Sequence, residues 1–352
     1  MSEHNQYMQR CIELAKNGLG NVAPNPMVGC VIVYKDQIIG EGYHQKYGKA
    51  HAEVNAINSV KDKSLLTNSR LYVNLEPCAH FGKTPPCSDL IVEYKIPEVI
   101  IGCVDSFSLV AGKGINRLRQ AGISVICGIN EAECRELNKR FFTFHERKRP
   151  YVILKWAQTL DGFIDKSRER NSKPGINWIS NKYSKILVHQ WRTQEQAILV
   201  GNRTALNDNP QLNVRLVSGK SPLRMVLDKD LKLPNSLNLF DKSIPTLIFT
   251  QRENVTSSSS SCENIEYISI DFSADIHPQI NDFLYQKNIQ SLIVEGGSTL
   301  LNSYIKNDLW DEARVIIGNT TFGSGLKAPV INLPNQFIEE FGDDKLIFFR
   351  NK

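Results

Sequence analysis

The sequence lacks the features that mark several specialised classes of protein. No apolar run reaches the ~18 consecutive residues of a transmembrane helix. The opening residues are mixed polar and amphipathic, without an apolar stretch and a small-residue cleavage site, so we expect no secretory signal. The composition is 41% hydrophobic and 22% charged, with 15 Pro and 22 Gly, which excludes a disordered, collagen-like or coiled-coil chain.

The chain also lacks a strong charge of one sign. Its 42 Lys and Arg oppose 37 Asp and Glu, and a net charge of +5 on 352 residues is mild. We therefore expect a small anionic substrate and no nucleic-acid partner. The absence of a long apolar run predicts no membrane partner, and the sequence leaves a homo-oligomer open. The chain has eight cysteines. Without a secretory signal they predict a reduced, cytoplasmic protein rather than a disulfide framework.

Strand and helix patterns alternate through the first half of the chain and predict a mostly parallel α/β sheet. A long helix ending near residues 140–142 is expected to close this half. The other predicted helices span 6–17, 52–60, 88–94 and 115–121, and the predicted strands span 28–33, 38–42, 71–75, 98–103 and 124–127.

A charge run at 145–150, closed by Pro150, predicts a domain boundary, although a solvated loop within one domain remains an alternative. We expect domains over 1–145 and 150–352. The polar, low-complexity segment 256–261 is expected to be a mobile surface loop. A second α/β pattern follows Pro150, with strands over 151–155, 196–200, 223–227, 246–250, 267–270, 291–294 and 312–317.

The first half carries a pattern typical of zinc deaminases, in which H-x-E is followed by Pro-Cys and a second cysteine. Here His51 and Glu53 form the first part, and Cys78 and Cys87 supply the thiolates. The second cysteine comes nine positions after the first, whereas the signature has it three positions after. A catalytic zinc takes three protein ligands and keeps a fourth position open for water. Glu53 need not bind the metal, and its carboxylate can move protons between water and substrate.

Two alternatives remain at this point. The site could be a closed structural centre with His80 or Cys103 as fourth ligand, or Cys78 and Cys87 could simply be buried without metal. The acid in H-x-E, the surrounding βαβ pattern and the polar loop between the cysteines favour an open catalytic site.

The second half has no G-x-G-x-x-G after its first strand, so a Rossmann dinucleotide site is not supported. Residues 292–300 instead form an apolar run, two glycines and a helix start, where backbone N–H groups can meet a phosphate. A plain strand-to-helix turn is the alternative.

Several further motifs accompany the HAE at 51–53. They are APNPMVG at 23–29, the stretch 76–87 ending in TPPC, and the stretches 155–162, 177–180, 190–192 and 201–215 in the second half. Taken together, these motifs resemble one family, the bifunctional deaminase–reductases of riboflavin biosynthesis, and the resemblance covers essentially the whole chain. The resemblance implies a cytidine-deaminase-like α/β/α domain followed by a dihydrofolate-reductase-like α/β domain. It also implies zinc, NADPH and phosphorylated pyrimidine substrates.

The expected activities are two. The first half should deaminate 2,5-diamino-6-ribosylamino-4(3H)-pyrimidinone 5′-phosphate. The second should reduce the ribosyl group of 5-amino-6-(5-phosphoribosylamino)uracil with NADPH. An editing deaminase acting on nucleic acid and a non-catalytic zinc-stabilised binding protein are the rival interpretations.

The resemblance assigns the site residues. In the deaminase half, zinc is bound by His51, Cys78 and Cys87, Glu53 is the proton shuttle, and the pyrimidine site is lined by Asn25, His44, His80 and Lys83. For the last four, a turn or surface role is the alternative.

In the reductase half, the contacts with NADPH are Ala157, Trp178, Thr204, Asp208, Gly297, Ser298 and Thr299. The reductase substrate is assigned to Lys155, as the catalytic residue, and to Arg192, Leu212, Arg215 and Glu295. An arginine pair suits a phosphate, although either arginine alone would more often form a surface ion pair.

The chain departs from the family pattern in three places. The loop 105–114 lacks two prolines and an asparagine, so we expect it to be less rigid. Ile176 replaces a serine, so one phosphate contact is expected to be missing or moved. The run 316–320 differs from the usual Ala-Pro run, and we expect this to affect packing only.

Overall fold

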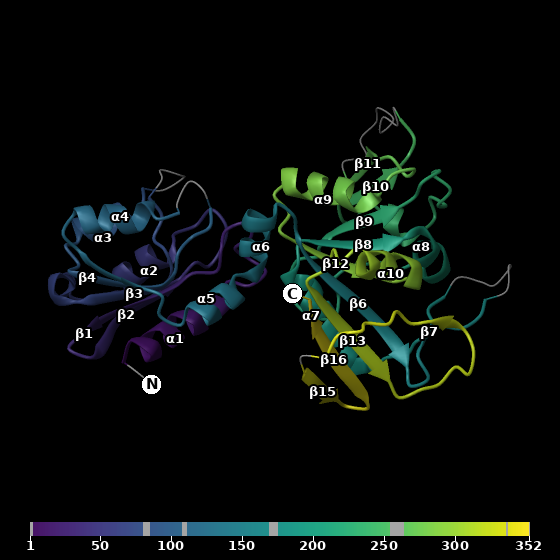
Figure 1. Cartoon of the computed structure of the whole chain (residues 1–352), viewed down its shortest axis with the longest axis horizontal. Helices are drawn as coiled ribbons and strands as arrows, with labels where there is room; N and C mark the ends of the chain where they lie inside the picture. Colours follow the sequence, from purple (N-terminus) through teal and green to yellow (C-terminus); the bar gives the residue numbers. More distant parts are fainter. Residues whose placement is uncertain are drawn as a thin grey trace. The chain divides into compact units, whose positions relative to one another are not determined.

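The computed structural model describes residues 3–79, 85–107, 111–168, 175–253, 264–335 and 337–351. The chain forms two compact units, residues 1–148 and 149–352, and each has its own sheet (Figure 1). The segment 256–261, for which the sequence predicts a mobile loop, lies outside the described residues.

The first unit is built on a five-stranded sheet. Strands β3 and β4 and strands β4 and β5 pair in parallel, whereas β1 is antiparallel to both β2 and β3. The expectation of a mostly parallel sheet is therefore wrong for this unit. Lys35 and Asp36 both have positive φ, which is the geometry of a tight hairpin turn, so β2 returns directly beside β1. The strand order is β2 (Gln37–Tyr43), β1 (Gly29–Tyr34), β3 (Arg70–Leu75), β4 (Glu98–Cys103) and β5 (Ser124–Cys127).

Helices cover both faces of this sheet, as Figure 1 shows. The side chains of β1 alternate between two hydrophobic cores, with Cys30 and Ile32 in one and Val31 and Val33 in the other. The first core lies under α2 (Ala52–Ser59), α3 (Cys87–Glu93) and α4 (Lys113–Gln120), and the second under α1 (Glu3–Lys16), α5 (Glu131–Leu137) and α6 (Lys139–Arg147). The result is an α/β/α layering.

The long helix expected near the end of this unit is in fact two helices. The α5 and α6 helices are interrupted at Asn138, and α6 continues to Arg147, through part of the charge run. The Asn138 Oδ1 accepts from the Met27 backbone nitrogen at 2.8 Å, and its Nδ2 donates to the Met27 carbonyl at 2.9 Å. This pairing with a distant loop holds the break in place.

The second unit contains a nine-stranded sheet. Its first seven strands are parallel, and an antiparallel hairpin that the sequence did not predict, β15–β16, completes one edge. The strand order is β11 (Ile265–Ser269), β10 (Thr246–Thr250), β9 (Leu223–Leu227), β8 (Ala197–Gly201), β12 (Ser291–Glu295), β6 (Tyr151–Thr159), β13 (Glu312–Gly318), β16 (Asp344–Arg350) and β15 (Phe337–Phe341). Strands β7 (Phe163–Asp165) and β14 (Leu326–Lys327) form a separate small sheet.

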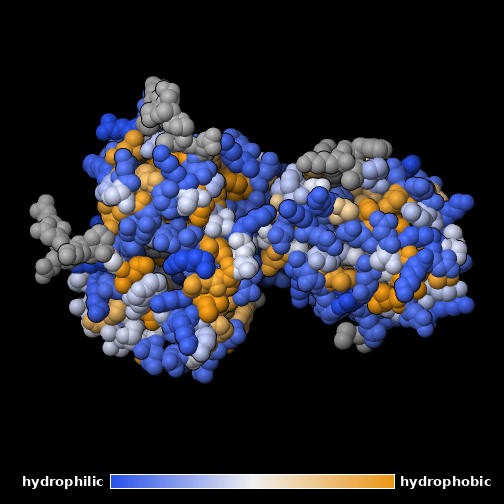
Figure 2. Space-filling view, turned by 180° about the vertical axis from the view of Figure 1, so that it is seen from behind, coloured by the Kyte–Doolittle hydropathy of each residue, from blue (hydrophilic) through white to orange (hydrophobic). Residues whose placement is uncertain are grey.

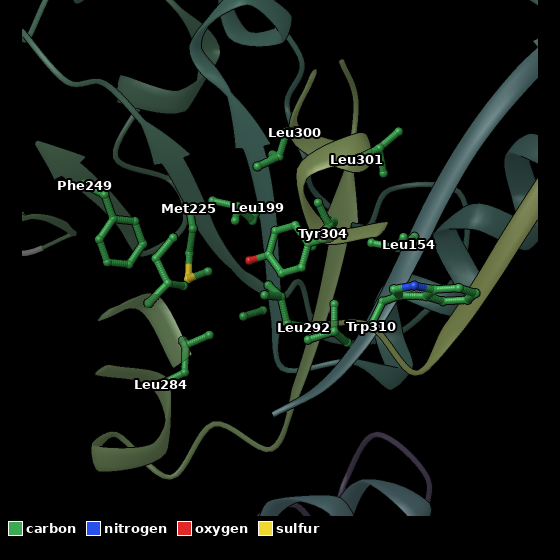
Figure 3. Packing of buried hydrophobic residues seen from close by; sticks show 14 of the residues in the cluster. Leu154, Leu199, Met225, Phe249, Leu284, Leu292, Leu300, Leu301, Tyr304 and Trp310 are labelled. Atoms are coloured by element: carbon green, nitrogen blue, oxygen red, sulfur yellow. The ribbon is translucent and has the colours of Figure 1, made fainter. Parts of the chain in front are cut away.

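Helices also cover both faces of the nine-stranded sheet. The α9 (Ile276–Gln286) and α10 (Ser298–Lys306) helices pack on one face, where Tyr304 and Trp310 lie among leucines and Met225 (Figure 3). The α7 (Lys182–Gln194) and α8 (Asn202–Asp208) helices pack on the other. Lys155 and Glu295 are paired across β6 and β12, and Arg192 of α7 bonds Glu295, so these polar side chains lie on the α7 face.

None of the described helices is both long enough and apolar enough to span a membrane. On the face shown in Figure 2, hydrophobic residues occur in separated groups among hydrophilic ones.

Candidate active sites

Three side chains from separate parts of the first unit converge on one point. His51 is the N-cap residue of α2, Cys87 is the first residue of α3, and Cys78 lies in the segment that follows β3. The His51 Nδ1 is 3.5 Å from the Cys78 Sγ and 3.3 Å from the Cys87 Sγ. These ligand atoms all lie within 4.8 Å of one another, which fits a zinc ion bound by one imidazole and two thiolates.

The closed alternative receives no support from Cys103. Its thiol donates to the Asn74 carbonyl at 3.3 Å, and among the described residues the potential metal-binding group contains only the three side chains above. His80, the other potential fourth ligand, lies outside the described residues, as does Lys83.

Glu53 lies in the first turn of α2, directly beside this group, and its side chain is only 3% exposed. Burial raises the pKa of its carboxyl, and the neighbouring Cys78 raises it further. Hydrogen bonds from Cys87 and His51 lower the pKa of Cys78 to about 4, although burial opposes them. A carboxyl whose pKa is shifted toward neutrality suits proton transfer at neutral pH.

Asn25 and His44 are linked to each other beside the same centre. The His44 Nδ1 is 3.0 Å from the Ala50 carbonyl, and its Nε2 is 3.1 Å from the Asn25 Nδ2. A carbonyl can only accept, so the Nδ1 carries the proton and the Nε2 accepts from Asn25. Burial lowers the pKa of His44, which favours this neutral form. The His44 and His51 rings are 5.4 Å apart, so the pair adjoins the metal group.

Glu76 is a further buried residue of this unit, for which the sequence predicts no role although it begins the motif at 76–87. This carboxylate is 4% exposed and accepts from four backbone nitrogens of the loop and helix start at 105–115. Burial raises the pKa of Asp105, at the start of that loop, to about 6, and the charge of Cys78 acts in the same direction. Within the loop 105–114, where the chain departs from the family pattern, residues 108–110 lie outside the described residues.

The second unit contains a cavity of about 250 Å³ between α7, α8 and the carboxyl ends of β6, β8 and β12. Most of the residues that the sequence assigned to the reductase line it. They are Lys155, Ala157, Trp178, Arg192, Thr204, Asp208, Leu212, Arg215, Glu295 and Gly297. Ser298 and Thr299 are not among the described lining residues, and they form the first turn of α10. Ile176 lines the cavity where the family has a serine.

A buried ionic cluster lies on one wall of this cavity. The Glu295 carboxylate accepts from the Arg192 Nε at 3.2 Å and Nη2 at 2.9 Å, and the Lys155 Nζ is 4.0 Å away. Burial acts to raise the pKa of Glu295, but the charges of Arg192 and Lys155 lower it to about 2. Burial lowers the pKa of Lys155. The cluster therefore offers a fixed carboxylate and a desolvated amine to a bound molecule.

The glycine turn after β12 is shaped by close contact with α8. Gly296 has a φ of +87°, and a Cβ there would lie 2.6 Å from the Thr204 side chain. The Gly297 nitrogen donates to the Thr204 Oγ1 at 2.8 Å. Only glycine fits this approach, which brings a backbone turn and a helix N-terminus to the edge of the cavity, as phosphate binding requires.

Asp208 and Trp178 also line the cavity. The Arg168 Nη2 donates to the Asp208 Oδ1 at 3.0 Å, and burial nonetheless raises the pKa of Asp208 to about 6. The Trp178 side chain is 54% exposed, with the Lys185 Nζ 3.5 Å from its ring centroid. An exposed indole that lines a cavity can stack on a flat ring.

Sequence reasoning missed two residues of this region. His189 lines the cavity, and Arg168 joins Asp165 to Asp208. The only sequence signal for His189 is its position one residue before the 190–192 motif. Arg168 precedes residues 169–174, which lie outside the described part of the chain.

Comparisons with known proteins agree with this geometry. Residues 1–103 match the family model "Cytidine and deoxycytidylate deaminase zinc-binding region", and residues 150–338 match "RibD C-terminal domain". The riboflavin biosynthesis protein RibD of Aquifex aeolicus is 38% identical, over 98% of this chain and 97% of its own. That of Bacillus amyloliquefaciens is 41% identical, over 89% and 85%.

Solved structures show the same likeness over the whole chain. The Thermotoga maritima diaminohydroxyphosphoribosylaminopyrimidine deaminase/5-amino-6-(5-phosphoribosylamino)uracil reductase is 37% identical with a TM-score of 0.86, covering 99% of this chain and 98% of its own. Acinetobacter baumannii RibD is 30% identical with a TM-score of 0.85, again covering 99% and 98%.

Proposed function

The chain belongs to the RibD family of riboflavin biosynthesis proteins, and from this membership we propose how its residues carry out a deamination and a reduction. It is a bifunctional enzyme, with a zinc-dependent deaminase in its first unit and an NADPH-dependent reductase in its second. The residue assignment rests on the observation that each unit brings the side chains for its own reaction together in one place. In the first unit these are His51, Cys78, Cys87 and Glu53, and in the second they are the assigned residues that line the cavity.

In the deaminase, His51, Cys78 and Cys87 hold zinc, which supplies a Lewis acid that makes water acidic enough to react near neutral pH. Glu53 takes one proton from the attacking water and passes it to the ring nitrogen as the C–O bond forms. It then carries the second proton of the same water to the amine, so that the C–N bond breaks, ammonia leaves and a carbonyl remains. Asn25 uses its Nδ2 on His44, which leaves its Oδ1 to accept an N–H of the pyrimidine. The product is the uracil that the reductase uses.

In the reductase, NADPH supplies the hydride that opens the ribose at C1′. Ala157, Trp178, Thr204, Asp208 and the turn at 297–299 hold the cofactor. Lys155 and Glu295 hold the ribose hydroxyls, and Arg192, Leu212 and Arg215 bind the phosphoribosyl group. Lys155 positions C1′ for hydride transfer because its amine is held beside Glu295 at 4.0 Å.

We also place the enzyme in the cytoplasm and treat residues 1–145 and 150–352 as its two domains. The seven described cysteines are all free, which fits a reducing compartment.

The test is incubation of the purified chain with the diaminopyrimidine phosphate, with and without NADPH. We expect ammonia in both reactions. In the reaction that contains NADPH, we also expect the nicotinamide absorbance to fall. Failure to release ammonia, or failure to oxidise NADPH after deamination, would reject the corresponding half of the proposal.

A further inference from the structure

His189 is a buried histidine that lines the reductase cavity and has no role among the assigned residues. It lies on α7, three positions before Arg192, and its side chain is 4% exposed. The charges of Arg192, Arg215, Glu295 and Lys155 all act on its ring. The imidazole therefore lies among the four charged residues proposed to bind the phosphoribosyl substrate.

One contact determines which ring nitrogen of His189 carries the proton. The backbone nitrogen of Arg215 donates to the His189 Nδ1 at 3.2 Å. An imidazole nitrogen that accepts a hydrogen bond has no proton of its own, so the proton of the neutral ring is on Nε2. Burial lowers the pKa of His189 to about 4, and Arg192 and Arg215 lower it too, so the ring stays neutral at neutral pH.

The neighbouring donors are largely occupied by protein acceptors. Arg192 uses its Nε and Nη2 on Glu295 and its Nη1 on the Asn213 carbonyl. The Arg215 Nη1 donates to the Asn213 Oδ1 at 2.7 Å. For the His189 Nε2, by contrast, no hydrogen-bond acceptor is present among the described residues. An N–H of a residue that lines a cavity, without a protein partner among the described residues, is a donor available to a ligand.

We propose that His189 is a substrate-binding residue of the reductase, whose Nε2–H donates to a phosphate oxygen of the phosphoribosyl substrate beside Arg215. This inference rests on the proposed reductase function. Arg215 has no carboxylate partner in the described structure, whereas Lys155 and Arg192 face Glu295, so the anionic end of the substrate belongs near Arg215. A neutral donor adds a hydrogen bond there without adding a fourth cation to the cluster.

Two variants separate donation to the ligand from support of the loop that carries Arg215. In His189→Asn the side-chain oxygen can still accept from the Arg215 nitrogen, but the Nε2 donor is gone. In His189→Gln the amide nitrogen reaches toward the Nε2 position, but the Nδ1 acceptor is lost. His277→Asn is the matched control, because His277 is also 4% exposed in the same unit and its ring bonds Asp275 and Ser303 away from the cavity.

The readout is the reductase KM for 5-amino-6-(5-phosphoribosylamino)uracil, measured with the KM for NADPH, kcat and ammonia release. Hydrogen bonds to charged groups are strong enough that losing one should raise the KM about tenfold or more. We expect this rise in His189→Asn, with kcat and the KM for NADPH nearly unchanged, and a much smaller rise in His189→Gln and His277→Asn. A rise confined to the substrate KM is what loss of uniform binding produces.

The opposite ranking, with His189→Gln impaired and His189→Asn normal, would show that His189 only supports Arg215 and would overturn the proposal. A rise in the KM for NADPH instead would assign the donor to a cofactor phosphate. Calorimetric titration of the full chain with ribose 5-phosphate needs no turnover, and equal affinity in wild type and His189→Asn would also reject it. If the wild type failed to oxidise NADPH but bound ribose 5-phosphate through His189, the proposed reductase function would fail, and with it the substrate role, while the phosphate contact of His189 would stand.

Discussion

The Glu76 carboxylate lies 2.9 Å from the backbone nitrogen of Gly114, 38 positions further along the chain. Its other oxygen accepts from the nitrogens of Gly112 at 2.9 Å and Asp105 at 3.3 Å. Because Glu76 stands two residues before the metal ligand Cys78, one carboxylate ties the metal site to the loop that carries Asp105. The start of α4 therefore helps to hold the geometry of the deaminase site.

Replacing Gly114 with alanine should damage this connection. A Cβ at Gly114 would lie 1.9 Å from the Pro77 carbonyl oxygen, so the segment next to Cys78 must move. We expect Gly114→Ala to lower zinc content and ammonia release while leaving NADPH oxidation intact. The control is Gly122→Ala at the far end of α4, where φ is +82° but no atom lies within 4 Å. Its backbone strain is only about 1 kcal/mol, and equal damage in both variants would refute the argument.

Zinc content should depend directly on Cys78. We expect about one zinc per chain in the purified protein, and Cys78→Ser should lose both the metal and deaminase activity, because three ligands are the minimum for a catalytic site. Metal analysis by atomic emission, together with ammonia release, measures both effects. Full activity in a metal-free preparation would contradict the zinc assignment.

Glu53 should be needed for deamination but not for metal binding. The Glu53→Gln side chain is nearly isosteric and cannot carry a proton, so we expect ammonia release to fall ~10²–10⁴-fold with zinc content unchanged. The control is Glu41→Gln, because Glu41 forms a surface ion pair with Arg10 and does not belong to the metal group. Near-native turnover in Glu53→Gln would remove Glu53 from the proton-transfer role.

The two activities should separate at Lys155. We expect Lys155→Ala to abolish NADPH oxidation with the deaminated intermediate, because misplacement of C1′ costs rate steeply, and to leave ammonia release largely intact. Lys287→Ala, which removes a surface ion pair with Glu266, serves as the control. Wild-type behaviour would mean that Lys155 is only a strand-end charge. Loss of both activities would mean that the two units do not function separately.

The deaminase unit should lose stability in acid through His145. This side chain packs against the rings of Phe107, Phe141 and Phe144, and burial lowers its pKa to about 4. The unfolded chain binds the proton near pH 6.5, so the stability contributed by neutral His145 is present above that pH and is lost as the pH falls toward 4.

The measurement is the urea unfolding free energy of the deaminase unit in wild type and His145→Gln at pH 7 and pH 5. We expect wild type to lose more free energy than the variant between these two values. Equal losses would show that His145 does not titrate differently in the folded chain.

Much of the deaminase chemistry could be predicted from the sequence, because it depends on residue types at short spacing. His51 and Glu53 stand two residues apart, and a helix start at Ala52 holds both at one end of α2. The strands that contribute to both cores could also be predicted, since apolar runs mark them. The proposed metal ligands were expected from the same kind of local motif, whereas the arginines and the lysine of the reductase were expected only from the family resemblance.

Other features depended on pairs of residues that lie far apart in the chain. The break at Asn138 exists because its amide satisfies the backbone of Met27, 111 positions away, and helical periodicity carries no trace of that partner. Arg192 meets Glu295 across 103 positions, and the proton of His189 is placed by a backbone nitrogen 26 positions away. Local sequence determined which groups were available and where most of the core strands run. Only the packed sheet, which returns distant segments to one cavity wall, decided which donors meet acceptors and which side chains lose water.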